Sequence, residues 1–395
     1  MKTSIDGILY FFILSNPLIS LALDGTTIRY YYITLPLVFI LLFLRLYQIK
    51  KYKIMMLAIL FVSAISIGLA IAKGGDYGKI NNHLFNYLDC IFLYLLFSLP
   101  EKRDDFLKTI KRHNKEMIAM IALINATELY LIVTHRGYSY NYNWGGTFYH
   151  GTNSMPHTLA YLMIITVIYT IILSIIERNR IYCLFALVPL YCIFISGVRI
   201  ALLPTGILLF IIIDVFISKR TKSKFIRFLK ALIVCVIFVT LFYDKILSSN
   251  MIAKILKRHT TGVVTSGRLE VWVYLFNNFK KSAFNWIFGM GDQTVYTLNT
   301  LNPKYHSSIW AHSDFVQILV GKGLFCLVGY IYAIYVFCKS LISPKKYYGI
   351  LMVIVIVGLA ALNGFYSYRE SMLGIPAITV LVYLLDEQWF KVSGK

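Results

Sequence analysis

The feature that most constrains this chain is a series of apolar runs, each long enough to cross a lipid bilayer. Crossing the hydrocarbon core takes roughly 17 to 25 residues of α-helix. Runs of this kind recur along the whole sequence. We predict about twelve transmembrane helices, at residues 6–23, 28–47, 54–72, 84–99, 117–134, 157–176, 181–197, 200–217, 229–247, 313–338, 347–362 and 371–386. The seventh and eighth of these runs could instead form one interrupted element.

The composition agrees with a chain that lies in lipid. Hydrophobic residues make up 58% of the sequence and charged residues 14%, and the mean hydropathy is +0.68. Such a chain has too little polar surface to cover two or three soluble domains. We therefore predict an all-α polytopic membrane protein with a single transmembrane domain over residues 1–395. Residues 6–23 are expected to remain as the first helix, because one lysine before this run is a weak signal for cleavage.

The formal net charge of +21 raises the question of a nucleic-acid partner. The lysines and arginines, however, cluster in alternate short segments between apolar runs, and no base-reading motif accompanies them. Segments of this kind face the cytoplasm under the positive-inside rule. We expect both termini in the cytoplasm and no nucleic-acid partner. The segments 135–156 and 248–311 then face outward, and the length of the second indicates a functional loop with amphipathic helices of its own.

Several classes of enzyme chemistry have no motif here. The six cysteines fall in or beside apolar runs without a Cys-x-x-Cys pair, so we expect no disulfide and no metal site. The sequence contains no Asp-x-Asp, His-x-x-x-His, Gly-x-x-x-x-Gly-Lys or Gly-x-Ser-x-Gly. These absences disfavour a metal-chelating nucleotide-sugar enzyme, a zinc hydrolase, an ATPase and a serine hydrolase. We expect no cofactor.

One candidate residue for chemistry is Arg199, in the run Ser196-Gly197-Val198-Arg199 at the outer mouth between two apolar runs. A guanidinium that is only partly solvated there could hold a phosphate bidentately. The alternative is an arginine that snorkels to the lipid headgroups. Gly197 favours a close approach of the backbone.

A second arginine, Arg268, follows Ser266-Gly267 in the long outer segment. It starts a pattern that predicts an amphipathic helix on the outer leaflet or on the bundle, with apolar positions at Leu269, Val273, Phe276 and Phe279 or Lys280. The first turn of a helix favours an anion through its free amide groups and its dipole. A cation there is mildly unfavourable unless an anion joins it. Arg268 is therefore a candidate for anion binding, with a plain solvated charge as the alternative.

The long segment ends in Trp310-Ala311-His312-Ser313-Asp314, immediately before the helix expected at 313–338. This places His312 at the outer membrane surface. A histidine with a nearby acid could act as a general base, because its ordinary pKa lies close to working pH. The alternative is a structural interfacial histidine. Asp292, Asp314 or Glu270 could orient His312 or an arginine, and the sequence does not choose among them.

The order of these features resembles the O-antigen polymerase and O-antigen ligase superfamily of bacterial envelope polysaccharide synthesis. The resemblance spans residues 135–375. It rests on the Ser-Gly-x-Arg junction, the Ser-Gly-Arg-x-x-x-Trp start of the long-loop helix, the Phe288-Gly289-Met290-Gly291 turn and the His-Ser-Asp-Phe-x-x-x-Leu-x-x-x-Gly run from His312 to Gly323. Gly146-Thr147-Phe148 followed by Asn153 and Pro156 is also similar, but its spacing is wider. A role for Asn153 or His157 is therefore not carried over.

The resemblance implies a fold similar to the metal-independent lipid-linked sugar transferases, with the active site at the outer face of the bacterial inner membrane. The donor would be an oligosaccharide on undecaprenyl pyrophosphate. Arg199 and Arg268 would hold the pyrophosphate as it leaves, and His312 would deprotonate the acceptor hydroxyl. Arg369 looks like a further family position that could bind phosphate or glycan. Pairing of Arg369 with Glu370 or with headgroups is the alternative.

Two activities share this scaffold. A polymerase passes the growing glycan to the next lipid-linked repeat unit, and a ligase passes the finished glycan to the lipid A core. The His312-Ser313-Asp314-Phe315 form favours the polymerase, in whose pathway a chain-length regulator and a flippase would be partners. A flippase is the alternative of another class, but it should carry polar sites near the bilayer midplane. Asp89, Glu128 and Asp214 are expected near helix ends, and Lys322 is the main deep charge.

Overall fold

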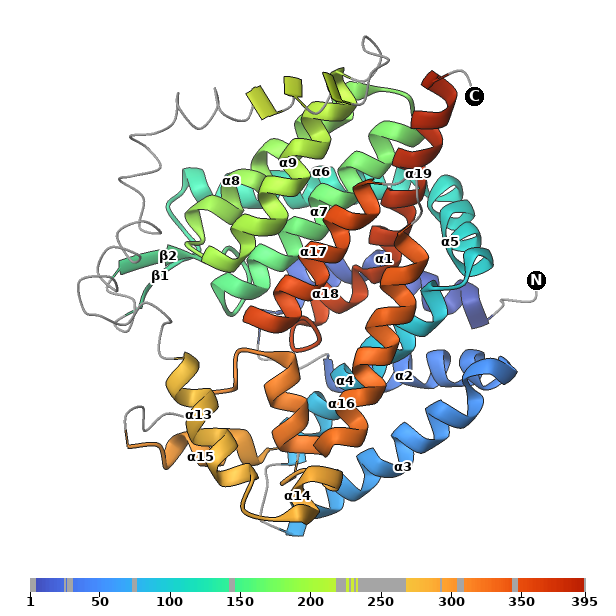
Figure 1. Cartoon of the computed structure of the whole chain (residues 1–395). Coiled ribbons are helices and arrows are strands. Elements are labelled where there is room, and N and C mark those ends of the chain that lie inside the picture. The colour runs from blue at the N-terminus through green and yellow to red at the C-terminus, as the bar shows by residue number, and fades with distance from the viewer. Residues whose placement is uncertain are drawn as a thin grey trace.

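The computed structural model describes residues 5–24, 26, 31–72, 77–141, 146–217, 225–226, 229–230, 232–233, 268–291, 293–303, 309–342 and 347–393. Over these ranges the regular structure is helical apart from one short hairpin (Figure 1). The elements, in order, are α1 (Ile5–Leu23), α2 (Tyr31–Tyr47), α3 (Lys50–Ala72), α4 (Tyr77–Phe97), α5 (Pro100–Arg112), α6 (Asn114–Val133), β1 (Tyr138–Asn141), β2 (Gly146–Tyr149), α7 (Pro156–Ile176), η1 (Arg180–Ala186), α8 (Leu187–Ile195), η2 (Arg199–Ala201), α9 (Leu202–Ile217), α13 (Arg268–Phe279), α14 (Ala283–Phe288), α15 (Thr294–Thr300), α16 (Asp314–Leu341), α17 (Tyr347–Leu362), α18 (Arg369–Leu373) and α19 (Ile375–Ser393).

Five of these helices are long and apolar enough to cross a membrane, namely α1, α3, α6, α7 and α16. The bent pair His83–Phe97 and Pro100–Arg112 adds a sixth if it is counted as one span, and shorter apolar helices include Tyr31–Tyr47 and Arg180–Ile195. Lengths near 20 residues match the hydrocarbon thickness of a bilayer. The helical polytopic character is confirmed, whereas the number of twelve spans stays a prediction.

The apolar runs located the helices well. Eleven of the predicted runs coincide with helical elements, and the run at 229–247 lies almost wholly outside the described residues. Gly197, at φ +66°, turns the chain between α8 and α9. The seventh and eighth runs are therefore two elements.

Helix α7 forms the centre of the bundle. Its 18-residue apolar window is 94% buried, and it packs against α1, α6, α8, α9, α18 and α19. The helix begins where the extended Met155 is followed by Pro156, whose fixed φ suits the first helical position. A second layer forms where α4 packs between α2 and α16.

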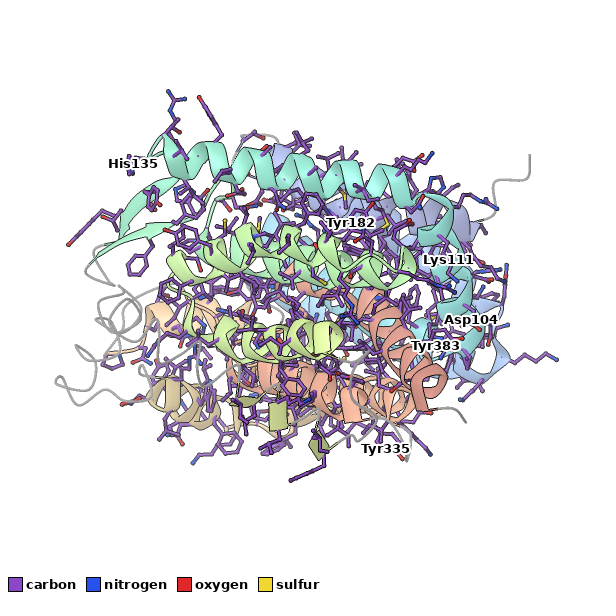
Figure 2. All side chains as sticks on the ribbon, turned by 90° about the horizontal axis from the view of Figure 1, so that it is seen from above. Asp104, Lys111, His135, Tyr182, Tyr335 and Tyr383 are labelled. Carbon is purple, nitrogen blue, oxygen red and sulfur yellow. The ribbon has the colours of Figure 1, made fainter. Side chains whose placement is uncertain are left out.

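The two ends of the bundle carry different elements. In Figure 1 the N-terminal turn of α1 and the C-terminal turn of α19 lie at one end, and the β1–β2 hairpin and α13 lie toward the other. Figure 2, seen from above, likewise sets His135 at the end opposite Lys111 and Asp104. The hairpin, from a segment expected to face outward, and α5, from a segment expected to face the cytoplasm, thus lie toward opposite ends. Which end faces the cytoplasm stays a prediction.

Helix α5 lies in a segment that the sequence reading treated as a cytoplasmic loop. Its axis turns by 96° from the preceding helix, with Pro100 at the first helical position. The helix was missed because it is amphipathic rather than apolar. Asp6 of α1 anchors this corner through an ion pair of 2.8 Å to Lys102 and a second ion pair to Arg45.

The outer segment 135–156 contains an antiparallel hairpin rather than a plain loop. Strands β1 and β2 pair in the register Tyr138 to Tyr149, and the rings of these two tyrosines lie 4.9 Å apart. The Tyr149 hydroxyl donates a hydrogen bond of 2.5 Å to Glu128 of α6, which ties the hairpin to the bundle. Burial and the neighbouring Glu128 carboxylate raise the pKa of Tyr149 well above its usual range.

The described part of the long outer segment folds into α13, α14 and α15. Helix α13 was predicted to be amphipathic and to lie on the outer leaflet or on the bundle, with apolar positions at Leu269, Val273, Phe276 and Phe279 or Lys280. Of these, Phe279 is buried and packs with Val271 and Leu275 against α15 and α16, whereas Leu269, Val273 and Phe276 are exposed. The helix has apolar residues on both faces, so periodicity alone could not choose the buried one.

Helix α16 is interrupted at Gly323, whose φ of +84° is not helical. The interruption leaves backbone carbonyls of the first segment without helical partners. The Gly289–Gly291 turn fills this gap, because Met290 N–H donates to Val320 O at 2.8 Å and Gly291 N–H donates to Gly321 O at 3.0 Å. The turn predicted at these glycines therefore docks the outer segment onto α16.

Candidate functional site

The guanidinium of Arg268 caps the end of a neighbouring helix. Its Nη1 donates to the carbonyl of Leu362, the last residue of α17, and its Nη2 lies 3.4 Å from Oδ1 of Asn363. The C-terminal end of a helix presents unpaired carbonyls and a partial negative charge. This contact offsets the unfavourable position of a cation at the start of α13. Arg268 is partly exposed.

Asn363 connects Arg268 to the core of the bundle, and the sequence reading did not single it out. It is fully buried, accepts from Arg268, and donates from Nδ2 to the Tyr161 hydroxyl at 3.1 Å. Tyr161 lies near the start of α7. The only signal in the sequence was an amide directly after the apolar run of α17, which by itself also fits a helix terminus.

A row of rings extends from this network to His312. The Tyr368 ring lies 4.6 Å from that of Tyr161 and 6.0 Å from that of Trp310, and Trp310 lies edge-on to His312 at 5.9 Å. His157 stacks on Tyr368 at 6.0 Å. The histidine that the sequence left without a role therefore lies at the same site as His312.

Tyr368 is a neutral hydrogen-bonding group at this site. Burial raises the pKa of Tyr368 to about 12, although its contact with Asn363 and the charge of Arg268 counteract part of that rise. A phenol with such a pKa keeps its proton at working pH. A base in this region must therefore be another group, and a partly exposed imidazole meets that need.

His312 adopts a left-handed backbone conformation, with φ +53°. For a residue with a Cβ this conformation costs about 1 kcal/mol or more. Both polar backbone groups of the preceding residue are held, because Trp272 Nε1 donates to Ala311 O at 2.6 Å and Ala311 N–H donates to Gln317 Oε1 at 3.1 Å. Strained residues that the surroundings hold in place are frequent at functional sites.

Asp314 was a candidate to orient His312, but its Oδ2 atom has other partners. It accepts hydrogen bonds from the Tyr330 hydroxyl at 2.6 Å and from the backbone N–H groups of Phe365 and Tyr366 at 2.7 and 3.2 Å. The side chain is fully buried. Its geometry thus holds the turn after α17 in place beneath Trp310.

Arg199 begins η2 at the same end of the bundle. The preceding Gly197 allows the close approach that its sequence suggested, because a Cβ there would lie 2.5 Å from the Phe148 ring of β2. The hairpin therefore covers this junction, and η2 packs against α7. Arg199 is partly exposed.

Arg369 forms an ion pair with the adjacent Glu370, which is one of the alternatives that the sequence left open. Both side chains are buried, and Glu370 also accepts a hydrogen bond of 3.2 Å from Ser20 of α1. Asn153 donates to the same Ser20 at 3.3 Å. These residues join α1, α18 and the hairpin segment, so their observed contacts are structural.

The two remaining acids are less informative. Glu270 lies in the first turn of α13, next to Arg268, and is partly exposed. Asp292 lies outside the described residues. Over the part of the chain that the structure describes, no three histidine, cysteine, aspartate or glutamate side chains come together as a metal site.

One expectation about deep charges was wrong. Asp89 was placed near a helix end, but α4 begins at Tyr77, so Asp89 lies well inside this helix and is fully buried. Lys322 is also fully buried, with its Nζ 4.9 Å from the centre of the Tyr87 ring. These two residues are polar sites of the kind that the transport alternative requires.

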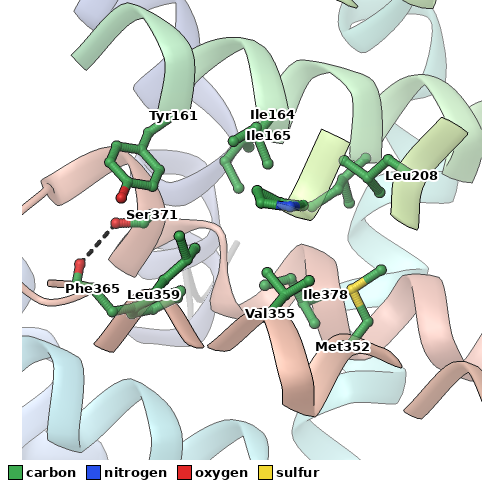
Figure 3. A pocket seen from close by; sticks show the side chains of 12 residues that line it. Tyr161, Ile164, Ile165, Leu208, Met352, Val355, Leu359, Phe365, Ser371 and Ile378 are labelled. Carbon is green, nitrogen blue, oxygen red and sulfur yellow. Dashed lines mark hydrogen bonds between the residues drawn. The ribbon is translucent and has the colours of Figure 1, made fainter. Parts of the chain in front are cut away.

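One cavity of the bundle is lined mainly by apolar side chains. This cavity, between α7, α9 and α17, has Tyr161, Phe365 and Ser371 at one end and aliphatic side chains such as Leu208 and Met352 at the other (Figure 3). Its lining contains no charged side chain.

Fold and site together define a polytopic helical membrane protein with an arginine, a histidine and a row of aromatic rings at one end of its bundle. Residues 183–331 match the family model described as O-antigen ligase. This match confirms the resemblance to the O-antigen polymerase and ligase superfamily, whose members are membrane enzymes of the O-antigen pathway that act on lipid-linked glycans. The matched range contains Arg199, Arg268 and His312. No curated protein matches the chain.

Proposed function

We propose that this protein is a polymerase that transfers a growing glycan from undecaprenyl pyrophosphate to the next lipid-linked repeat unit, at the outer face of the bacterial inner membrane. The observation that carries the proposal is the joint placement of Arg268 and His312 by α13, whose Arg268 binds the end of α17 and whose Trp272 binds the peptide before His312. A lipid-linked substrate presents its polar headgroup at the membrane surface, where this end of the bundle would lie. Both termini would be cytoplasmic, and a flippase and a chain-length regulator of the same pathway would be partners.

In the proposed reaction, His312 accepts the proton of an acceptor hydroxyl. The hydroxyl oxygen then bonds to the anomeric carbon of the donor glycan, and the bond from that carbon to the pyrophosphate oxygen breaks. Both electrons of the broken bond leave with undecaprenyl pyrophosphate. Arg199 and Arg268 stabilise the charge that develops on the leaving group, and neither residue requires a metal for this.

The position of the imidazole supports the role of base. Its Nδ1 atom is buried, which leaves Nε2 as the nitrogen for the acceptor hydroxyl. Arg369 and Glu270 would support binding of the glycan or of phosphate only indirectly, since Arg369 is buried against Glu370. Asp314 would support the site by holding residues 365 and 366.

Deleting the gene in the producing bacterium and separating its surface glycan on a gel tests the proposal. A core that carries a single repeat unit supports the polymerase. Long chains that are not attached to lipid A core indicate the ligase, which the description of the matched family favours as second candidate. Lipid-linked units that accumulate on the inner face would overturn both in favour of a flippase.

A further inference from the structure

We propose that Trp272 is a positioning residue for His312, and that it sets the rate of transfer by fixing the backbone from which the imidazole projects. The inference rests on the proposed role of His312 as the base. Trp272 follows Arg268 by one helical turn on α13, so the two side chains emerge on the same side of that helix.

The peptide between Ala311 and His312 is held by a side chain of α13. Its carbonyl accepts the indole N–H of Trp272 at 2.6 Å, which is a short bond for a neutral pair. The amide of Ala311 donates to Gln317 Oε1 at 3.1 Å. Ala311 itself is fully buried. Both polar groups of this residue are therefore fixed by side chains from two helices.

The backbone of His312, directly after this peptide, has an unusual conformation. His312 has φ +53°, a value that residues with a Cβ rarely adopt. An unrestrained chain would relax to negative φ, and the imidazole would then project in another direction. The Trp272 and Gln317 bonds oppose that relaxation. The indole thus acts on the orientation of His312 without touching the reacting atoms.

Helix α13 couples the proposed anion-binding residue to the proposed base. Arg268 binds the end of α17, and Trp272 binds the residue before His312. Arg268 and Trp272 lie one helical turn apart on α13. Docking of α13 on the bundle therefore positions the proposed pyrophosphate-binding group and the proposed base together. A loss of the indole bond should leave the arginine docked while the base becomes misplaced.

Trp272→Phe is the sharpest test, because it keeps an aromatic ring and removes the N–H. Elongation rates are measured in membranes that contain each variant, with lipid-linked saccharide extracted from the deletion strain as the substrate. We expect a fall in kcat of roughly tenfold to a hundredfold, because small displacements of a catalytic group have effects of that size. The apparent KM for the lipid-linked saccharide should change little.

A double-mutant cycle separates positioning from general stability. If Trp272 acts through His312, Trp272→Phe combined with His312→Ala should be no slower than His312→Ala alone. A further fall in the double variant would overturn the proposal. Trp286→Phe is the matched control: Trp286 packs on Phe279 at 4.9 Å on the same outer segment, and its substitution should leave kcat unchanged.

If Trp272→Phe folds poorly, Gln317→Met provides a second test. It removes the other side-chain hydrogen bond to Ala311, which comes from α16. It should lower kcat in the same way. Wild-type rates in both variants, together with an inactive His312→Ala, would overturn the positioning role while leaving the proposed function intact. An active His312→Ala would instead overturn the proposed base.

Discussion

Arg268 and Asn363 meet where α13 docks on the end of α17, with Nη2 of the guanidinium 3.4 Å from Oδ1 of the amide. The same guanidinium binds the carbonyl of Leu362. Two contacts from one planar group fix its orientation, which a flexible ammonium cannot reproduce. A small change of chemistry at Arg268 should therefore have a large effect.

We expect Arg268→Lys to lower the elongation rate by roughly a hundredfold, as loss of one preorganised donor to a developing anion commonly does. The measurement is chain elongation in membranes at saturating lipid-linked saccharide. Lys281→Arg, on the same exposed outer segment, is the control for a change of basic residue type. Comparable rates for Arg268→Lys and wild type would show that only the charge matters.

Asn363→Leu should reduce the rate by about tenfold or more, because it removes both an acceptor for Arg268 and the amide that donates to the buried Tyr161 hydroxyl. Asn363→Asp retains the acceptor and should keep more activity than the leucine variant. Tyr161→Phe tests the second bond alone. If the aspartate and leucine variants lose the same activity, the contact with Arg268 is not what Asn363 contributes.

Asp314 offers a test between a structural and an orienting role. Asp314→Ala should lower stability by about 3 kcal/mol, because it leaves the N–H groups of Phe365 and Tyr366 and the Tyr330 hydroxyl without their acceptor. Asp314→Asn keeps an oxygen acceptor and should retain most activity. Thermal unfolding in detergent and elongation rates measure the two effects. An asparagine variant that is stable but inactive would favour an orienting negative charge.

The dependence of rate on pH should show one group on the acid side. A histidine base must be neutral, so the rate should fall as the pH drops and the imidazole takes up a proton. Burial raises the pKa of Tyr368 to about 12, so this phenol stays protonated over the same range. Tyr368→Phe should therefore leave the shape of the profile unchanged. An acid limb that survives in His312→Ala would assign that limb to another group.

The helices were predictable because a bilayer demands apolar runs of a fixed length, and these runs are a property of the sequence alone. Arg199, Arg268 and His312 could be singled out in the same way, since charged residues beside such runs are few. Helix α5 was not found, because its apolar face alternates with charges, and the sequence could not choose which apolar side chains of α13 pack on the bundle.

Contacts between distant segments were beyond the reach of sequence reasoning. The role of Asn363 depends on its hydrogen bonds with Arg268 and Tyr161, which lie far from it along the chain. Asp314 looked like a partner for its neighbour His312, yet its hydrogen bonds reach the turn after α17. The residues were visible in the sequence, but their partners depended on how the outer segment docks onto the bundle.

Docking of that segment depends on Gly289 and Gly323, which have φ values of +74° and +84°. A Cβ on Gly323 would lie 2.3 Å from the carbonyl oxygen of Ile287, and one on Gly289 would lie 2.4 Å from that of Gly321. Gly321 O accepts from Gly291 N–H, so it cannot move without weakening the contact between the turn and α16. We expect Gly323→Ala to lower stability by about 2 kcal/mol or more.

Thermal unfolding of the purified protein in detergent measures this loss, with Gly206→Ala as the control. Gly206 lies inside α9 with no atom near the position of a Cβ, so alanine there should be neutral or slightly stabilising. Because both glycines serve one contact, the Gly289→Ala and Gly323→Ala double variant should lose less stability than the sum of the two single losses. A fully additive loss would mean that the turn and the interruption of α16 are stabilised independently, and that the outer segment is held to the bundle elsewhere.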